Sequence, residues 1–215
     1  MRNRPYRDHR GVAKYRHEVL AAILRVDERL EVLATPRSRD PFVGQWALIG
    51  GPVEVDETME QAIARHMTGH LDGARPVHVE QVSTVSDPAR DPFERTIATA
   101  YLALTPPDGL PEMVGNSWLP VDDLPNMAFD HAQIVSAAAR RLRSKTSYTN
   151  IVYALAPEEF TMARLRAIYQ AVLGHEVDVT NLGRVLRRRD QIEKTGDVAG
   201  AGGGGGRAGG ARRGL

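Results

Sequence analysis

Residues 46–73 constrain the fold more than any other part of the chain. An apolar segment at residues 46–49 leads into the glycine pair at 50–51, then an acidic loop, then a helical pattern. Thr58 is typical of a helix N-cap, and Gln61 three residues later completes a capping box. Apolar residues then recur at the spacing of one helix face: Met59, Ala62, Ile63 and Met67. The stretch therefore predicts a buried strand, a glycine-containing loop and an amphipathic helix.

This arrangement resembles the Nudix box, the signature of enzymes that split nucleoside diphosphates linked to another group. The box has a glycine, a glutamate six positions on and an arginine eight further, which Gly51, Glu57 and Arg65 match. It continues with a glutamate, an apolar residue, a spacer and two more glutamates. At those positions this chain has His66, Met67, Thr68, Gly69 and His70.

The missing glutamates would carry the chemistry. Magnesium needs several oxygen ligands in tight geometry, so these enzymes crowd carboxylates onto one helical turn beside the diphosphate. Glu57 and Glu60 alone do not rebuild such a cluster. The resemblance therefore implies a box that serves for its shape, in a protein that is not an enzyme and has no catalytic residues.

Two histidines on this helix admit a second interpretation. His66 and His70 are four residues apart and share a helix face, as in some zinc sites. The chain has no Cys and no third ligand is obvious nearby, so we expect solvent-facing or pocket-lining histidines and no metal. Gly69 weakens a helix interior, and we expect it to end the helix early.

Length and composition bound the class of protein. A chain of 215 residues is long enough for one large or two small domains. The absence of Cys excludes disulfides, thiolate metal sites and cysteine nucleophiles, and fits a reducing cytoplasm. The longest apolar run near the N-terminus, residues 19–24, is too short for a signal sequence or a membrane span. We expect a soluble, cytoplasmic protein with no membrane partner.

The charge is distributed unevenly along the chain. Residues 1–139 hold 14 Lys and Arg against 20 Asp and Glu, and residues 140–215 hold 14 against 7. The net charges of −6 and +7 sum to the +1 of the whole chain. An acidic body with a basic end indicates that only the end meets a polyanion. For the last twenty residues, a solvated basic tail is the simpler explanation.

The pattern predicts a first domain over residues 17–143. Residues 1–16 form a basic N-terminal segment, either an arm or the edge of that domain. Strands are expected at 17–24, 30–35, 77–85, 96–104 and 118–120. A last helix is expected at 130–143, with Asp130 as its N-cap. A mixed sheet between helices, an α/β/α Nudix sandwich, accounts for these elements.

Five residues of this domain are candidates for binding a ligand: Arg37, Trp46, Glu57, Arg90 and Arg95. The charged loop at 37–44 leads into the box strand. Trp46 suits stacking on a base, although a core position is the commoner role for Trp. Arg90 and Arg95 place two guanidinium groups on one connection, which suits a diphosphate but also fits an exposed hairpin loop.

A second domain is predicted over residues 144–215. Thr161 caps a helix that ends near Gly174, and Asp178 caps another that extends to about residue 190. Two helices joined by a short glycine-containing turn have helix-turn-helix geometry, although a protein-docking element is an alternative. The outward face of the second helix is polar and basic, with Thr180, Asn181, Arg184, Arg187 and Arg188.

A wing is expected after these helices. Residues 191–195 and 211–213 can pair, with the glycine-rich residues 196–210 as the tip. We expect Lys194 to contact phosphate groups of DNA together with Arg187 and Arg188. The whole segment 144–215 then reads as a winged helix-turn-helix domain with a Gly-rich tail.

Nearly the whole chain resembles the Nudix-related transcriptional regulators, the NrtR family. The most specific matches lie in residues 153–155, 157–161, 169, 173–174 and 177–178 and in the Gly-Arg-rich end. The resemblance implies a homodimeric repressor of NAD biosynthesis or salvage genes that binds a palindromic operator. Its Nudix domain would sense ADP-ribose or a related NAD metabolite and require no cofactor. The chain departs from the family where a run of five glycines replaces the arginine-rich wing.

Two other functions remain open at the level of sequence. One is a working hydrolase of the ADP-ribose pyrophosphatase type with a basic tail, which the missing glutamates disfavour. The other is a protein-interaction scaffold, which leaves Arg184, Arg187 and Arg188 without a role.

Overall fold

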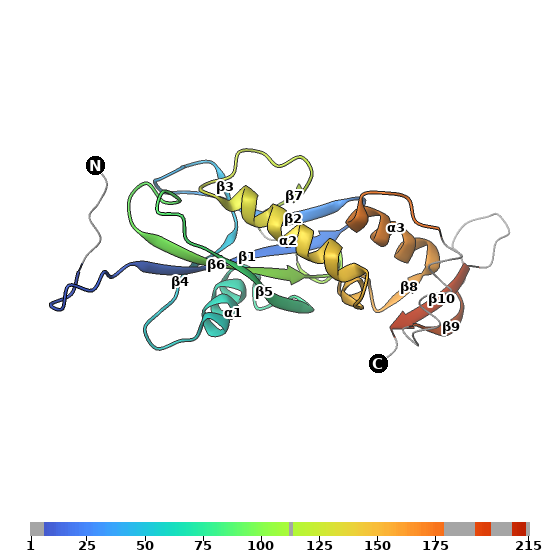
Figure 1. Cartoon of the computed structure of the whole chain (residues 1–215). Coiled ribbons are helices and arrows are strands. Elements are labelled where there is room, and N and C mark those ends of the chain that lie inside the picture. The colour runs from blue at the N-terminus through green and yellow to red at the C-terminus, as the bar shows by residue number, and fades with distance from the viewer. Residues whose placement is uncertain (1–6, 112–113, 179–191, 199–207, 214–215) are drawn as a thin grey trace.

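Strand β1 (Arg16–Val26) is the centre of the larger sheet because it is paired along both edges. It runs parallel to β6 (Thr96–Leu104) and antiparallel to β2 (Leu30–Pro36) and β4 (Ile49–Pro52). The sheet order is β3-β2-β1-β6-β5, with β4 also paired to β1 and β7 to β2. The remaining strands are β3 (Trp46–Ala47), β5 (His78–Val85) and β7 (Ser117–Pro120). The computed structural model describes residues 7–111, 114–178, 192–198 and 208–213 (Figure 1).

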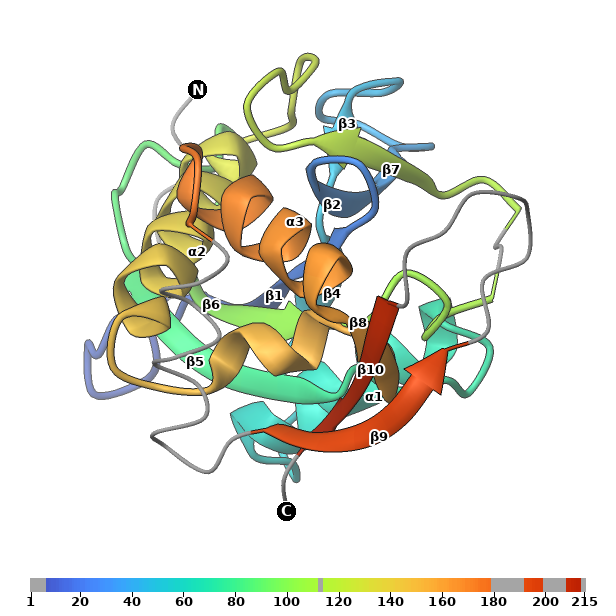
Figure 2. The same ribbon diagram turned by 90° about the vertical axis from the view of Figure 1, so that its right-hand side faces the viewer.

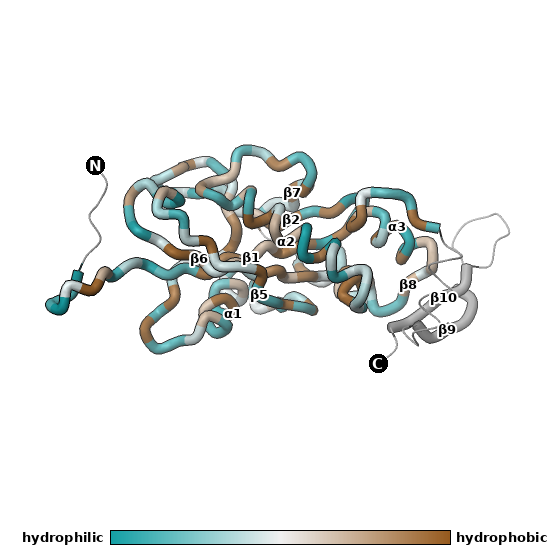
Figure 3. Tube along the Cα trace, in the orientation of Figure 1, coloured by the Kyte–Doolittle hydropathy of each residue, from teal (hydrophilic) through white to brown (hydrophobic). Residues whose placement is uncertain are grey.

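Both faces of β1 are buried, and its alternating side chains enter two separate cores. Val19, Ala21 and Ile23 pack toward α1 (Met59–His70). Leu20, Ala22 and Leu24 face the opposite side. That side is covered by α2 (His131–Thr146), the 3₁₀ helix η1 (Ile151–Leu155) and α3 (Met162–Leu173). The expected α/β/α sandwich with a mixed sheet is confirmed, and hydrophobic segments gather in its centre (Figure 3).

Helix α1 begins as the sequence indicates but does not end early. The capping box is present, with Thr58 Oγ1 accepting from the Gln61 N–H and the Gln61 side chain accepting from the Thr58 N–H. The expectation that Gly69 terminates the helix is wrong, since α1 continues to His70. The buried side chain of Leu71 follows at the C-cap, and its N–H donates to the Met67 carbonyl. This packing outweighs the low helix propensity of one exposed glycine.

Helix α2 begins at the expected residue, but Asp130 does not cap it. The Asp130 side chain makes no capping hydrogen bond. Its two oxygens instead accept from Arg90 Nε at 3.0 Å and Nη2 at 2.8 Å. The helix also extends beyond the predicted end at residue 143, to Thr146, whose buried hydroxyl donates to the Leu142 carbonyl. A buried charge pair therefore replaces the expected local cap.

The apolar segment at residues 46–49 forms two short strands instead of one. β3 pairs with the end of β2, and β4 pairs with β1. The chain changes partner at Leu48, whose N–H donates to the His131 side chain. Gly50 permits the close approach of β4 to β1, since a Cβ there would lie 2.0 Å from the Val19 carbonyl oxygen.

The C-terminal part adds a three-stranded sheet to α3. β8 (Glu159–Thr161) pairs with β10 (Ala208–Arg213), which pairs with β9 (Ile192–Val198). Two predictions are confirmed: Thr161 caps α3, and Gly174 ends it in the left-handed conformation. The paired wing strands are confirmed as well, with β9 longer than expected, whereas β8 was not predicted. The tip at 199–207 and the second helix of the predicted helix-turn-helix, after Asp178, lie outside the described residues.

Helices α2 and α3 lie side by side over one face of the large sheet (Figure 2). The buried side chains of α3 are Leu165, Ile168, Tyr169 and Val172. They belong to the same apolar cluster as Leu20 and Leu24 of β1. The first helix of the winged-helix part is thus packed into the core of the sandwich.

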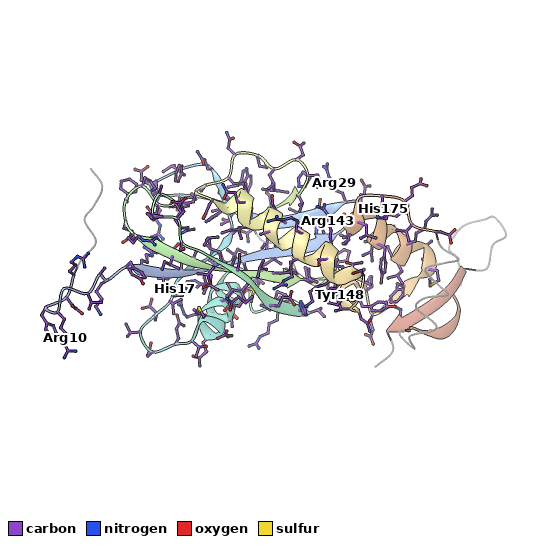
Figure 4. The ribbon with its side chains drawn as sticks, viewed as in Figure 1. Arg10, His17, Arg29, Arg143, Tyr148 and His175 are labelled. Atoms are coloured by element: carbon purple, nitrogen blue, oxygen red, sulfur yellow. The ribbon has the colours of Figure 1, made fainter. Side chains whose placement is uncertain are left out.

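The N-terminal segment projects from the opposite end of the molecule. A bridge between Arg7 and Ala13 closes a turn, with Arg10 at its tip (Figure 4). Asp8 Oδ1 accepts from the backbone N–H groups of Arg10 and Val12 and so holds this turn. None of the helices described here is long and apolar enough to cross a membrane.

Two glycine substitutions test this packing. Gly50→Ala forces a Cβ against the backbone of Val19, and we expect the free energy of unfolding to fall by roughly 3 kcal/mol. Gly69→Ala, on an exposed helix face with nothing within 4 Å, should raise it by up to about 1 kcal/mol. Denaturant unfolding measures both. An unchanged midpoint for Gly50→Ala would contradict the close approach of β4 to β1.

Candidate functional site

The acidic loop of the box is closed by its arginine. Arg65 Nε donates to Glu57 Oε2 at 2.9 Å, and Nη2 donates to Glu57 Oε1 and to the Pro52 carbonyl at 3.0 Å. The Glu54 N–H also donates to Glu57 Oε1. The hydrogen bonds from Arg65, followed by that from Glu54, lower the pKa of Glu57 to about 2. Glu57 is thus an ionised carboxylate already engaged by its own loop.

His66 occupies the position where the box has its first glutamate. Its Nε2 lies 3.0 Å from the Pro52 carbonyl, to which it donates. The ring lies so close to Gly51 that a Cβ on that glycine would be 2.5 Å from its Cε1 atom. The imidazole therefore braces the glycine loop.

The two histidines of α1 do not converge on a metal. His70 Nδ1 lies 2.9 Å from the carbonyl of His66, one turn earlier, while the His66 ring bonds to Pro52. Within the described residues, no three His, Cys, Asp or Glu side chains are grouped closely enough to hold a metal ion.

A cavity of about 320 Å³ opens on the α2 side of the glycine loop. β1 contributes Leu20, and the box strand contributes Ala47, Leu48, Gly50 and Gly51. Three guanidinium groups line it as well: Arg16, Arg37 and Arg39. Four carboxylates accompany them: Glu18, Asp40, Asp91 and Glu94. Arg16 is paired with Glu18 at 2.8 Å and with Glu94 at 3.1 Å. The lining thus combines charged groups of both signs with a small apolar surface, and its guanidinium groups are of the kind that bind phosphates.

The rings of Phe129 and His131 line this cavity, and Phe42 packs against Phe129. Phe129 makes an edge-to-face contact with Phe42 at 4.9 Å between centroids and lies 5.5 Å from the His131 ring. The Arg37 guanidinium covers Phe129 at 4.8 Å, and Arg37 Nε donates to the Pro41 carbonyl at 2.7 Å. Phe42 and Phe129 have φ values of 67° and 51°, in the left-handed region that non-glycine residues rarely adopt. Backbone strain of this kind is typical of functional sites.

His131 lies at the start of α2 and also lines the cavity. Its Nδ1 accepts a hydrogen bond from the Leu48 N–H at 3.0 Å. The residue is only 3% exposed. Burial lowers the pKa of His131 to about 3, against a weaker opposing effect of Asp130. The ring is therefore neutral at physiological pH.

Of the five predicted ligand-binding residues, only Arg37 lines the cavity. Trp46 is half-buried and packs against the core cluster, and Glu57 is paired with Arg65. The Arg90 side chain is 2% exposed and held by Asp130. Arg95 donates to the Thr96 carbonyl and covers Tyr15 at 5.7 Å. Four of the five residues thus lie outside the cavity lining, although Arg90 Nη1 is 3.9 Å from Oε2 of the lining residue Glu18.

The two predicted ligand-facing segments do reach the cavity, through other residues. The loop at 37–44 contributes Arg39, Asp40 and Pro41, and the connection at 90–95 contributes Asp91, Phe93 and Glu94. Arg16, Phe129 and His131 were missed. No local pattern marks Phe129 or His131, because both depend on contacts with segments more than 80 residues earlier in the chain.

The predicted DNA-contacting residues Thr180, Asn181, Arg184, Arg187 and Arg188 lie outside the described residues. Lys194 lies in β9, next to the bulge in its pairing with β10.

Comparison with known families accounts for both parts of the chain. The NUDIX domain matches residues 14–138, and the NrtR DNA-binding winged helix domain matches residues 152–209. The chain belongs to the NrtR family.

Relatives of this NrtR-family chain include both regulators and an enzyme. It is 29% identical over 182 residues to the ADPR responsive transcriptional repressor NtrR of Acinetobacter baylyi, covering 81% of this chain and 73% of the relative. It is 30% identical over 135 residues to an ADP-ribose pyrophosphatase of Methanocaldococcus jannaschii, covering 59% of this chain and 78% of the relative.

Solved structures of Shewanella oneidensis NrtR are similar over both parts. The complex with a 27mer DNA has a TM-score of 0.80 at 27% identity and covers 91% of this chain and 92% of that chain. The NUDIX domain of the same protein complexed with ADP ribose has a TM-score of 0.53 at 29% identity, covering 63% of this chain and 93% of that chain.

The buried histidine gives this fold a defined pH dependence. An unfolded chain protonates His131 near pH 6.5, whereas the folded ring resists protonation down to about 3. The unfolded state therefore binds more protons in this window, and stability falls as the pH drops from 6.5 toward 3. We expect His131 to account for about 2 kcal/mol of the loss between pH 7 and pH 5. Denaturant unfolding at both pH values should show a smaller loss in His131→Asn. The same loss in both proteins would mean that the folded ring accepts a proton.

Proposed function

We propose that this chain is a ligand-responsive transcriptional repressor, whose NUDIX domain binds ADP-ribose or a related NAD metabolite and thereby releases operator DNA. The observation that carries the proposal is the joint core of a cavity-bearing NUDIX sandwich and a winged-helix domain. The Acinetobacter relative is named for repression that responds to ADPR, and the Shewanella relative was crystallised with DNA and with ADP ribose. By the family resemblance, genes of NAD biosynthesis or salvage are the proposed targets.

The cavity supports a nucleoside diphosphate as ligand. Arg37 and Arg39 supply guanidinium groups, which pair with phosphate in a planar, bidentate manner, whereas Arg16 is already paired with Glu18 and Glu94. Phe93 also lines the cavity and is 58% exposed, so it is a candidate for stacking on a base. We assign the ligand to this cavity, with Arg37 as the one residue retained from the sequence-based set.

The box supports binding without cleavage. Glu57 is held by Arg65, and Glu60 accepts from the Tyr101 hydroxyl at 3.4 Å. His66 and His70 both use a ring nitrogen on backbone carbonyls. The carboxylate cluster that holds magnesium in the hydrolases has no counterpart in this helix.

The basic end supports DNA binding by a homodimer. A lone helix-turn-helix binds weakly, so we propose a two-fold dimer on a palindrome with half-sites about 34 Å apart, or a multiple of that. Thr180, Asn181 and Arg184 are assigned to base edges, and Arg187, Arg188 and Lys194 to phosphates.

Hydrogen bonds at the C-terminal end of α2 connect the cavity-bearing domain to the DNA-binding domain. Arg143 Nε donates to the Val172 carbonyl near the end of α3 at 2.8 Å. Arg164 of α3 donates to the carbonyls of Val26 and Asp27, both at 2.8 Å. Arg166 holds the segment after α3 through the Val177 carbonyl at 2.7 Å. A displacement of α2 would therefore be transmitted to α3 and to the turn that precedes the reading helix.

Reciprocal titration tests the proposed function. ADP-ribose titrated calorimetrically into the protein alone should bind more tightly than into the operator complex, by the same factor by which it weakens operator binding. A tenfold effect corresponds to about 1.4 kcal/mol of coupling, within the ordinary allosteric range. Equal affinities in the two titrations would mean that ADP-ribose is not the effector.

Two further measurements sharpen this experiment. Arg143→Met should keep both affinities but reduce the coupling, whereas Arg140→Met, an exposed neighbour on the same helix, should leave all three unchanged. The protein incubated with ADP-ribose and magnesium or manganese should release no AMP. Metal-dependent AMP release that Glu57→Gln abolishes would favour a hydrolase, as in the Methanocaldococcus relative.

Substitutions in the predicted second helix of the helix-turn-helix, from Asp178 to about residue 190, distinguish base contacts from phosphate contacts. Arg184→Ala should cost about 1–3 kcal/mol of operator binding and relax specificity at one base, if that side chain reads a guanine. Arg188→Ala should weaken all sequences alike and reduce the salt dependence by about one unit. Binding to operator and random DNA across a salt series distinguishes them. Identical behaviour of the two variants would contradict the assigned roles.

A further inference from the structure

His131 is held in a single tautomer by the backbone. Its Nδ1 accepts from the Leu48 N–H, so the one proton of the neutral ring must be on Nε2. Leu48 is 4% exposed and lies where β3 and β4 separate. The other tautomer would oppose two N–H groups and leave the buried Leu48 donor without an acceptor, which is costly.

The second nitrogen of this ring remains available. Nε2 makes no hydrogen bond to the described residues. It is nevertheless not fully buried, because it is absent from the solvent-inaccessible polar atoms of these residues that lack a hydrogen-bond partner. The ring itself lines the cavity. A nearly buried side chain thus presents one N–H donor to the space that we assign to the ligand.

The surroundings of the ring suit an uncharged part of the ligand. Phe129 lies against it, and Phe42 lies against Phe129. Arg37 and Arg39 supply positive charge in the same cavity, whereas burial keeps His131 neutral, with a pKa of about 3. A neutral N–H donor with a fixed direction selects for an acceptor atom at that place.

We propose that the Nε2–H of His131 donates to an uncharged acceptor of the bound nucleotide, either adenine N1 or a ribose oxygen, and so acts as a specificity-determining residue. This inference rests on the proposed function, because it requires a nucleotide in the cavity. His131 is also the first residue of α2, so this hydrogen bond attaches the ligand to the helix that contacts α3.

Two substitutions divide the two roles of the ring. His131→Asn places an oxygen near the Nδ1 position and keeps an acceptor for Leu48, but it removes the donor. His131→Gln places an amide N–H near the Nε2 position and removes the acceptor. We expect ADP-ribose affinity to fall about tenfold in His131→Asn, the effect of losing one neutral hydrogen bond. In His131→Gln it should stay within about threefold of wild type while the melting temperature falls.

A second ligand distinguishes recognition of the base from recognition of the sugar. Hypoxanthine carries a proton on N1 and cannot accept there, so the inosine analogue of ADP-ribose tests the base. If N1 is read, wild type prefers ADP-ribose and His131→Asn loses the preference. If a ribose oxygen is read, His131→Asn weakens both ligands equally. Either result supports a donor at Nε2.

Spectra of ¹⁵N-histidine-labelled wild type provide a test independent of the variants. They should show a protonated Nε2 and an unprotonated Nδ1, with the Nε2–H resonance moving when ADP-ribose is added. Full affinity in His131→Asn together with an unmoved Nε2–H signal would overturn the inference and leave the proposed function intact. Absence of ADP-ribose binding to wild type would overturn both.

Discussion

The double burial of β1 is the constraint on which the rest of this structure depends. A strand covered on both faces needs two apolar layers, and α1 is the helix that covers the face of Val19 and Ile23 among the described residues. The face of Leu20 and Leu24 is shared by α2, η1 and α3. A winged-helix domain is small, and sharing this core supplies apolar burial that it could not supply alone. The two parts of the chain therefore share one apolar core.

Contacts within the chain also explain how the altered Nudix box keeps its shape. In a hydrolase, the helix after the glycine loop must crowd several carboxylates and hold a cation to offset their repulsion. Here Arg65 and His66 instead donate to the Pro52 carbonyl, and Glu57 accepts from Arg65. The loop is held by neutral and oppositely charged partners, so it keeps its shape without a metal.

Features with local causes could be predicted from the sequence, and features with distant partners could not. The caps at Thr58 and Thr161, the bounds of β6 and the wing strands depend on near neighbours or on alternation along one segment. Asp130 has the local sequence of a helix cap, and nothing local indicates its actual partner, Arg90, which is 40 residues away. That pairing also removed Arg90 from the predicted ligand site. The break at Leu48 depends on His131, 83 residues away.

Helix α2 is anchored at both ends by partners from different parts of the chain. At its start, the bidentate pair of Asp130 with Arg90 is nearly buried, and removing one partner would leave a costly uncompensated charge. At its end, Arg143 holds α3 and Lys145 bonds to Glu80 of β5. Burial would raise the pKa of Glu80, but the bonds from Lys145 and His78 keep it below its ordinary value. A helix held this firmly does not bend easily, so a ligand that contacts its first turn must either leave it in place or shift it as a unit.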